Sequence, residues 1–246
     1  MEFMWPFILS SIAGLSTIIG SISIFLRVKD SNRFIAFSLS FSLAVMLGVS
    51  IFDLIPSALL YLNPNRVFVS ILVFILSFLL GSLLVRFLNR LIEKKSQDGL
   101  YNLGFLSFIT LVLHNFPEGI LTFLSTYHDF KLGLSLTLAI ALHNIPEGIS
   151  IAIPIYYSTN SKWQALKTTI LSGIAEPLGA LVAFAILKRF ITDEMVSVFL
   201  VFVAGIMVTL SIEKMLPEAE CYGNKKTLYL GFISGLIVVI VSVFLL

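Results

Sequence analysis

Eight long apolar runs, each ended by a short polar stretch, limit what this chain can fold into. A bilayer core about 30 Å thick needs roughly 20 apolar residues in helical form to cross it. The composition agrees, because 58% of the 246 residues are hydrophobic and 12% are charged, whereas soluble domains are roughly one quarter charged. The sequence therefore predicts an all-α integral membrane protein with a single transmembrane domain over residues 1–246. The expected spans are 7–26, 34–60, 67–90, 104–125, 131–157, 165–190, 194–217 and 227–246.

Basic residues favour one side of the expected membrane. The first, third, fifth and seventh connections hold twelve Lys and Arg residues, the even connections hold four, and the two termini hold none. The four are Arg66, Lys131, Lys188 and Arg189. By the positive-inside rule, the odd connections face the cytoplasm and both termini lie outside the cell's inner (cytoplasmic) membrane. The only cysteine, Cys221, excludes an internal disulfide and falls in the seventh connection.

A faint repeat relates the second and seventh expected spans. Residues 46–58 align with residues 207–219, and five of the thirteen positions are identical. Since these two spans cross the membrane in opposite directions, the match indicates inverted halves of the kind that transporters use for alternating access. Chance similarity between two helices rich in Leu and Ile is the alternative.

A six-residue motif occurs twice within apolar surroundings, as HNFPEG at residues 114–119 and as HNIPEG at residues 143–148. Positions i and i+4 of an α-helix lie about 40° apart around the axis, so the His and Glu of each motif project from one face. A short loop joins the two expected helices, so the two faces can converge. The candidate ligands from the motifs are His114, Asn115, Glu118, His143, Asn144 and Glu147.

These side chains would be costly in hydrocarbon without compensation, because an ionised carboxylate at the membrane centre costs about 3 kcal/mol on insertion scales. A metal ion is the leading candidate for that compensation. Imidazole nitrogen with carboxylate oxygen suits Zn²⁺, and amide oxygens extend the set to harder ions such as Fe²⁺ or Mn²⁺. Pro117 and Pro146 would open each helix beside its ligands, which survives only inside protein or beside a watery cavity.

Three further acidic residues stand near prolines in other expected spans. Glu176 precedes Pro177 in the sixth span and is predicted to be an additional metal ligand. Asp53 and Glu213 come shortly before prolines in the second and seventh spans. They are candidate stations along a polar pathway, with water-exposed span ends as the alternative.

Taken together, these motifs resemble the ZIP family (the Zrt- and Irt-like proteins), in particular its compact prokaryotic branch with HNxPEG in the fourth and fifth spans. The resemblance extends over essentially the whole chain. It implies eight helices in a 3+2+3 arrangement with inverted repeats, inward transport of divalent metal, and a homodimer. It also implies a two-metal site between the fourth, fifth and sixth spans. One ion would use His114, Glu118, His143 and Glu147, and the other Asn115, Asn144 and Glu176, with Glu118 and Glu147 bridging.

The chain also departs from the family's pattern. Many members carry a histidine-rich loop between the third and fourth spans, which is absent from this sequence. Members often place an acidic residue three positions before the proline of the seventh span, whereas this chain has Lys214 there and Glu213 one position earlier. The seventh span therefore carries a positive charge where members of the family often place a negative one.

The main hypothesis is a transporter, not an enzyme, that moves Zn²⁺ and related ions such as Fe²⁺, Mn²⁺ and Cd²⁺ into the cytoplasm. The metal is then a substrate and ligand, no cofactor is expected, and the partners are divalent metal ions and the lipid bilayer but no nucleic acid. An intramembrane metal-dependent hydrolase is the alternative, because carboxylate-bridged metals also form hydrolytic centres. Against it, the HExxH pattern is absent. A metal-stabilised structural protein or sensor is a third possibility.

Overall fold

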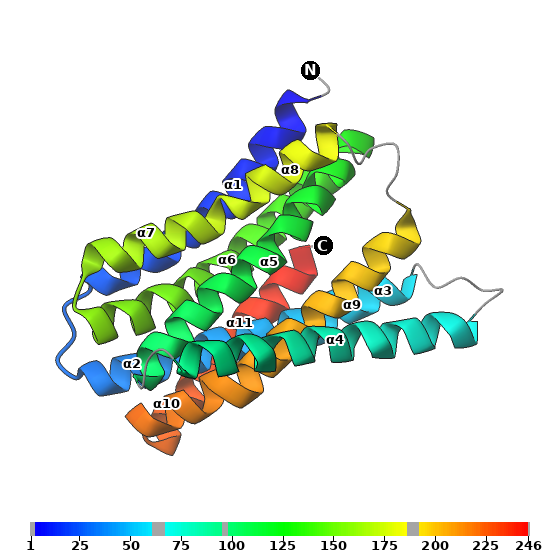
Figure 1. Cartoon of the computed structure of the whole chain (residues 1–246). Helices are drawn as coiled ribbons and strands as arrows, with labels where there is room; N and C mark the ends of the chain where they lie inside the picture. The colour runs from blue at the N-terminus through cyan, green and yellow to red at the C-terminus, as the bar shows by residue number, and fades with distance from the viewer. Residues whose placement is uncertain (1–2, 61–66, 95–97, 186–191, 246) are drawn as a thin grey trace.

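The structure is a computed structural model that describes residues 3–60, 67–94, 98–185 and 192–245 (Figure 1). These residues are helical almost throughout and contain no β-strand. The α-helices are α1 (Met4–Ser21), α2 (Ser31–Val49), α3 (Ile55–Leu60), α4 (Val67–Glu93), α5 (Gly99–His128), α6 (Phe130–Thr159), α7 (Lys162–Gly173), α8 (Ala175–Ala185), α9 (Asp193–Leu210), α10 (Leu216–Tyr222) and α11 (Lys225–Leu245). A 3₁₀ turn, η1 (Ile22–Phe25), follows α1, and two π-helical turns, η2 (Ser50–Leu54) and η4 (Ser211–Met215), interrupt the second and seventh spans.

Eight helical units among the described residues are long and apolar enough to cross a membrane. The all-α membrane fold expected from the sequence is therefore confirmed. Several helices begin before the apolar run does, because a polar residue caps them. Asp98 accepts a hydrogen bond from the Tyr101 N–H (3.0 Å), so α5 starts at the cap, ahead of the limit expected from hydropathy. Residues 186–190 of the sixth expected span and 246 of the eighth lie outside the described residues, as do Arg66, Lys188 and Arg189.

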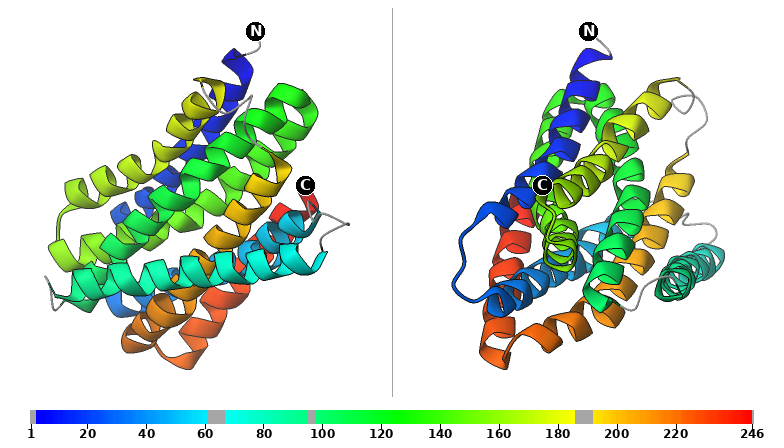
Figure 2. Two further views of the ribbon diagram at one scale, coloured as in Figure 1. Left: turned by 45° about the vertical axis from the view of Figure 1, so that its right-hand side comes forward. Right: turned by 60° about the vertical axis from the view of Figure 1, so that its left-hand side comes forward.

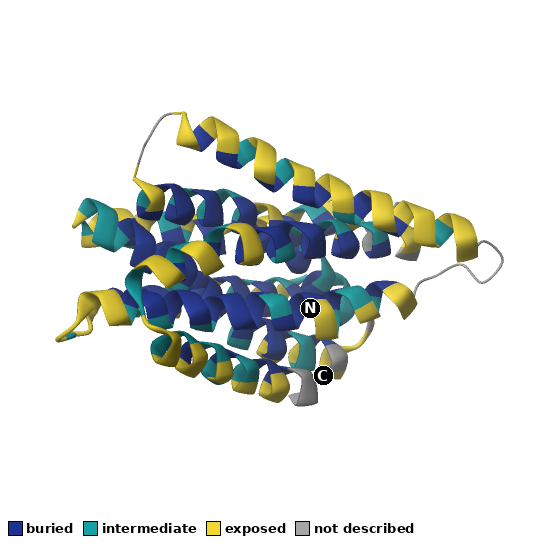
Figure 3. Ribbon diagram, turned by 90° about the horizontal axis from the view of Figure 1, so that it is seen from below, coloured by how far each residue is buried: buried dark blue, intermediate teal, exposed yellow. Residues whose placement is uncertain are grey.

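The two motif-bearing helices, α5 and α6, lie against each other in the middle of the bundle. On one side α1 packs on α6 and α8 packs on α5 (Figure 1). On the other side α2 and α11 pack together against α6, while α9 packs between α4 and α5. Figure 2 shows α4 at the edge of the bundle, and Figure 3 shows that most of its surface is exposed. An apolar, exposed edge helix is expected where the protein meets lipid.

The inverted repeat predicted for the second and seventh spans is visible in the backbone. The alignment of residues 46–58 with residues 207–219 places Ser50 on Ser211, and these two residues start the π-helical turns η2 and η4. Both turns end just before a proline, Pro56 or Pro217. Because proline removes an N–H donor, the chain widens into a π-turn ahead of it. The partner helices also correspond, since α2 packs on α11 as α9 packs on α4.

The same inversion relates α1 to the sixth span. Gly14 of α1 and Gly173 of α7 each face the other's carbonyl oxygen, so neither position has room for a methyl group. On either side of this crossing, Gly148 of α6 packs on the carbonyl of Thr17, and Gly119 of α5 packs on the carbonyl of Glu176. Small residues permit such close backbone contact between membrane helices. The correspondence therefore pairs α1 with α7–α8 and α6 with α5.

Candidate metal centre

The two HNxPEG motifs lie halfway along α5 and α6, where the helices touch. Each motif contains a proline inside its helix, Pro117 or Pro146. The carbonyl four residues before each proline loses its helical donor, which loosens the backbone beside the ligands. The imidazoles and carboxylates of both motifs are buried, with at most 4% of any of these residues exposed. The predicted convergence of the two helix faces is therefore present in the structure.

Imidazole nitrogens and carboxylate oxygens of the two motifs meet within contact distance. His114 Nε2 lies 3.2 Å from Glu118 Oε1 and 3.1 Å from Glu147 Oε1. His143 Nε2 lies 3.1 Å from Glu118 Oε1. Ligand atoms of His114, His143 and Glu147 all fall within 4.8 Å of one another, which is close enough for one ion to contact all three. Glu118 of the first motif therefore contacts the histidines of both motifs.

A second polar group adjoins the first and involves three helices. The Asn144 amide nitrogen donates to the carbonyl of Ala13 in α1 (2.9 Å) and to a carboxylate oxygen of Glu176 in α8. Asn115 mirrors it on α5, with its amide 3.4 Å from the carbonyl of Ser172 in α7. The reversed Asn115 amide instead donates to Glu147 Oε2 (3.3 Å). The three asparagine and glutamate ligands expected for a second ion thus adjoin the His–Glu group.

The donor set fits a divalent cation, because the buried carboxylates have no Lys or Arg partner among the described residues. Three buried carboxylates, from Glu118, Glu147 and Glu176, lie here, and the described part of the chain contains no buried Lys or Arg. Several donor atoms have no hydrogen-bond partner among the described residues. They are His114 Nδ1, His143 Nδ1, Glu118 Oε2, Asn144 Oδ1 and Glu176 Oε2. Since an isolated buried charge is costly, a metal ion is the compensation that this chemistry favours.

The two pathway candidates differ in their surroundings. Asp53 lies half-buried in η2 and accepts a hydrogen bond from Ser57 (3.1 Å). Glu213 lies in η4, where Arg86 of α4 donates to both of its carboxylate oxygens, at 2.6 and 3.1 Å. Asp53 therefore has a hydroxyl partner in a half-buried turn, whereas Glu213 is held in an ion pair at the bundle surface.

The sequence reading missed the contribution of α1. Ala13 supplies a carbonyl to Asn144, and Thr17 packs its backbone against Gly148 of the second motif. A signal was available in the matching glycines, because Gly14 and Gly20 of α1 recur at the same spacing as Gly173 and Gly179 of the sixth span. Small residues spaced for close helix contact carry no polar chemistry of their own, so they did not stand out.

Comparison with known proteins agrees with this geometry. A family model described as "ZIP Zinc transporter" matches residues 93–242. A protein named zinc transporter ZupT from Oceanobacillus iheyensis is 38% identical over 100% of this chain and 99% of its own length. Proteins of the same name from Streptococcus mutans and Chlorobium luteolum are also 38% identical, over 97% and 100% of this chain and 96% and 99% of their own lengths.

These relatives carry the name of transporters, so the hydrolase alternative gains no support from them. The family match spans the fourth to eighth helical units, and the relatives cover the rest of the chain. The membrane fold, the paired motifs at the centre of the bundle and the full-length similarity point the same way. This chain is a multi-pass membrane protein and a member of the ZIP family.

Proposed function

We propose that this chain transports divalent metal ions, Zn²⁺ among them, across the cytoplasmic membrane into the cytoplasm. One observation carries the proposal: two HNxPEG motifs bring two imidazoles and two carboxylates into mutual contact in the interior of a membrane bundle. Intramembrane ionisable groups of this kind mark ion pathways. The zinc transporters named among the relatives support the choice of ion.

The proposed centre holds two ions. His114, Glu118, His143 and Glu147 bind the first, as their distances of 3.1–3.2 Å permit. Asn115, Asn144 and Glu176 complete the second, with Glu118 and Glu147 bridging. The close contact between Asn144 and Glu176 supports this division. Transport proceeds by alternating access, for which the inverted repeat supplies two related halves.

The ion is substrate and ligand rather than a resident cofactor. Imidazole favours borderline metals such as Zn²⁺, while the carboxylates and amides accept harder ions. We therefore expect Zn²⁺, Fe²⁺, Mn²⁺ and Cd²⁺ to be carried. Both termini lie outside, the odd connections face the cytoplasm, and the protein works as a homodimer. Asp53 acts as a station on the outer part of the pathway, and Glu213 as one near the exit once its pair with Arg86 opens.

Metal flux into proteoliposomes tests the proposal. The purified chain should accumulate radioactive zinc, and Glu118→Ala and Glu147→Ala should each reduce accumulation to background, because a lost bridging carboxylate has no substitute in hydrocarbon. Asp129→Asn is the matched control. This carboxylate is exposed at the α5–α6 connection, where it accepts a hydrogen bond from the Lys131 N–H (2.7 Å), so its variant should keep near-parental uptake.

Three results would contradict the proposal. Metal binding without flux would indicate a structural or sensor protein. Metal-dependent hydrolysis of a peptide or lipid substrate without flux would indicate an enzyme. Undiminished uptake by both glutamate variants, at equal reconstitution, would remove the paired motifs from the transport path.

A further inference from the structure

We propose that Thr17 of α1 is an additional oxygen ligand of the metal centre, placed opposite Glu176, and that it determines how well hard divalent ions are accepted. The inference rests on the proposed transport function and adds a helix and a residue to its site. The argument combines the internal symmetry of the fold with the hydrogen-bonding state of this one hydroxyl.

Symmetry pairs Thr17 with Glu176. Gly14 and Gly173 face each other at the crossing of α1 and α7, and the next turn carries Thr17 on one helix and Glu176 on the other. Both residues present their backbone carbonyl to a motif glycine, Gly148 for Thr17 and Gly119 for Glu176. Position 17 therefore occupies, in the inverted half, the place that a proposed metal ligand occupies in the other half.

The positions of the asparagines follow the same relation. Asn144 donates to the carbonyl of Ala13 in α1, one turn before Thr17, and the side-chain amide of Asn115 lies 3.4 Å from the carbonyl of Ser172, one turn before Glu176. Asn144 also contacts the carboxylate of Glu176. The amide of Asn144 thus joins α1 to α8 at the second metal position. Thr17 adjoins that junction on the α1 side.

The hydroxyl of Thr17 is available for a ligand. A helical threonine ordinarily donates to the carbonyl four residues earlier, which here belongs to Ala13. That carbonyl already accepts from Ser16 Oγ (2.6 Å) and from the Asn144 amide (2.9 Å). Thr17 Oγ1 is fully buried and has no hydrogen-bond partner among the described residues. A buried hydroxyl without a partner is unfavourable, so its retention here calls for one.

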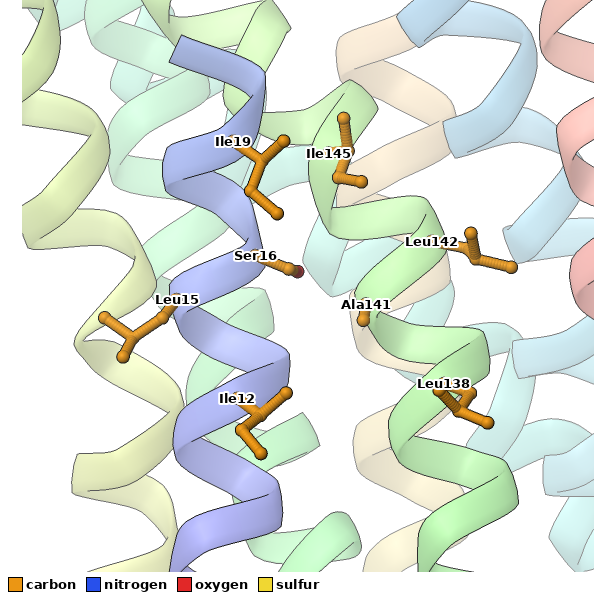
Figure 4. A pocket seen from close by; sticks show the side chains of 8 residues that line it. All are labelled: Ile12, Leu15, Ser16, Ile19, Leu138, Ala141, Leu142 and Ile145. Atoms are coloured by element: carbon orange, nitrogen blue, oxygen red, sulfur yellow. The ribbon is translucent and has the colours of Figure 1, made fainter. Parts of the chain in front are cut away.

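The direction of the side chain agrees with this role. Figure 4 shows Ser16 pointing into the apolar groove between α1 and α6, which Ile12, Leu15 and Leu138 also line. The next residue on a helix is turned by about 100°, which takes Thr17 out of the lipid-facing groove and into the bundle. The Thr17 Cβ lies 3.5 Å from the position that a Cβ atom on Gly173 would occupy. Thr17 therefore faces the α7–α8 side, where the second metal position lies.

The surrounding atoms favour a cation over another protein group. Besides Thr17 Oγ1, the oxygens Asn144 Oδ1 and Glu176 Oε2 are buried without hydrogen-bond partners in the described chain. All three are oxygen atoms with free lone pairs. A divalent ion that accepts oxygen ligands satisfies them together, and a neutral hydroxyl suits hard ions such as Mn²⁺ better than the softer Cd²⁺.

Thr17→Val tests the inference, because it removes the hydroxyl and keeps the branched shape. In proteoliposomes given Mn²⁺ and Zn²⁺ in competition, we expect Thr17→Val to lower Mn²⁺ uptake about fivefold and Zn²⁺ uptake less than about twofold, the size expected for one lost polar ligand. Thr17→Ser should keep the parental ratio of the two metals. Thr126→Val is the matched control, because the hydroxyl of this buried threonine donates to the Thr122 carbonyl (2.7 Å), two turns beyond Glu118.

A second measurement does not depend on transport. Mn²⁺ should raise the melting temperature of the purified parent and of Thr17→Ser, and raise it less for Thr17→Val and for the smaller Thr17→Ala. Without metal, Thr17→Val should melt no lower than the parent, since it loses no hydrogen bond. A parental Mn²⁺-to-Zn²⁺ ratio and a parental Mn²⁺ shift in Thr17→Val, or in Thr17→Ala if the valine variant does not fold, would overturn the assignment. Those results would leave the proposed function standing, whereas a parent chain without flux would remove the function itself.

Discussion

The two π-helical turns η2 and η4 have the same backbone conformation and carry opposite charges at one aligned position. The sequence alignment that superposes them places Asp53 on Lys214. Asp53 is half-buried and receives a hydrogen bond from Ser57 (3.1 Å). Lys214 instead lies 3.1 Å from the carboxylate of Glu93 in α4. The proline after each turn explains the shared bend, and nothing in the bend requires the same side chains.

The difference gives the two turns different charge environments. In η4, Lys214 pairs with Glu93 and Glu213 pairs with Arg86, so each charge is compensated by α4. In η2, Asp53 has a hydroxyl partner but no basic partner among the described residues. On the proposed pathway, a cation would therefore meet an uncompensated carboxylate at η2 and neutral pairs at η4. The symmetric fold supplies two related turns, and their side chains make them unequal.

The side of the membrane on which η4 lies gives the largest expected effect, because labelling of the nearby Cys221 is all or none. If the odd connections face the cytoplasm, the exposed Cys221 of α10 lies inside, near η4. A membrane-impermeant thiol reagent should leave Cys221 unlabelled in intact cells and label it after permeabilisation, and Cys221→Ser should give no signal in either case. Labelling of intact cells would place η4 outside and reverse the proposed direction of approach.

Reversing the charge of Asp53 should remove the difference in charge between η2 and η4. Asp53→Lys makes η2 resemble η4 and puts a cation beside the route to the centre, so zinc uptake should fall about tenfold or more through electrostatic repulsion. Asp129→Lys, a charge reversal at an exposed residue between α5 and α6, should change uptake much less. Equal uptake by Asp53→Lys and the parent would show that ions do not pass η2.

Much of this architecture could be predicted from the sequence. The eight spans follow from hydropathy, and the pairing of His114 and Glu118 with the second motif follows from helical spacing and a short loop. The faint repeat over residues 46–58 and 207–219 was also informative, because its proline and serine positions mark the π-turns. In these cases, local chemistry determines local structure.

Other features depend on contacts that no local pattern encodes. The pairing of Arg86 with Glu213 joins residues far apart in the chain, and it appears only once α4 packs on the seventh span. The hydrogen bond from Asn144 to the Ala13 carbonyl uses a backbone group that every residue has. Helix starts such as Gly99 follow capping rather than hydropathy. Long-range packing therefore determines which of the candidate groups are free to bind an ion.

Neutralising Asp53 and Lys214 in turn should give a smaller effect that can be compared quantitatively. Asp53→Asn removes one negative charge from the proposed approach. Two unit charges about 4 Å apart in a water-like dielectric interact by about 1 kcal/mol, so the half-saturating zinc concentration should rise about fivefold with little change in maximal rate. Lys214→Gln should change it less than about twofold, because Lys214 is already compensated by Glu93. Concentration-dependent uptake by the two variants measures both constants. A larger effect at Lys214 than at Asp53 would contradict the assigned asymmetry.

The smallest expected effect concerns the stability of the compensated turn. The side chains of Lys214 and Glu93 are 27% and 53% exposed, and exposed ion pairs contribute about 0–1 kcal/mol. In a double-mutant cycle with Lys214→Gln and Glu93→Gln, chemical or thermal unfolding in detergent should therefore give a coupling below about 1 kcal/mol. A small coupling means that the pair is easily broken and that transport effects at Lys214 report on charge rather than on loss of fold. A coupling of several kcal/mol would instead make the pair a structural lock on α4, and the potential at η4 could then no longer be varied independently of the packing of that helix.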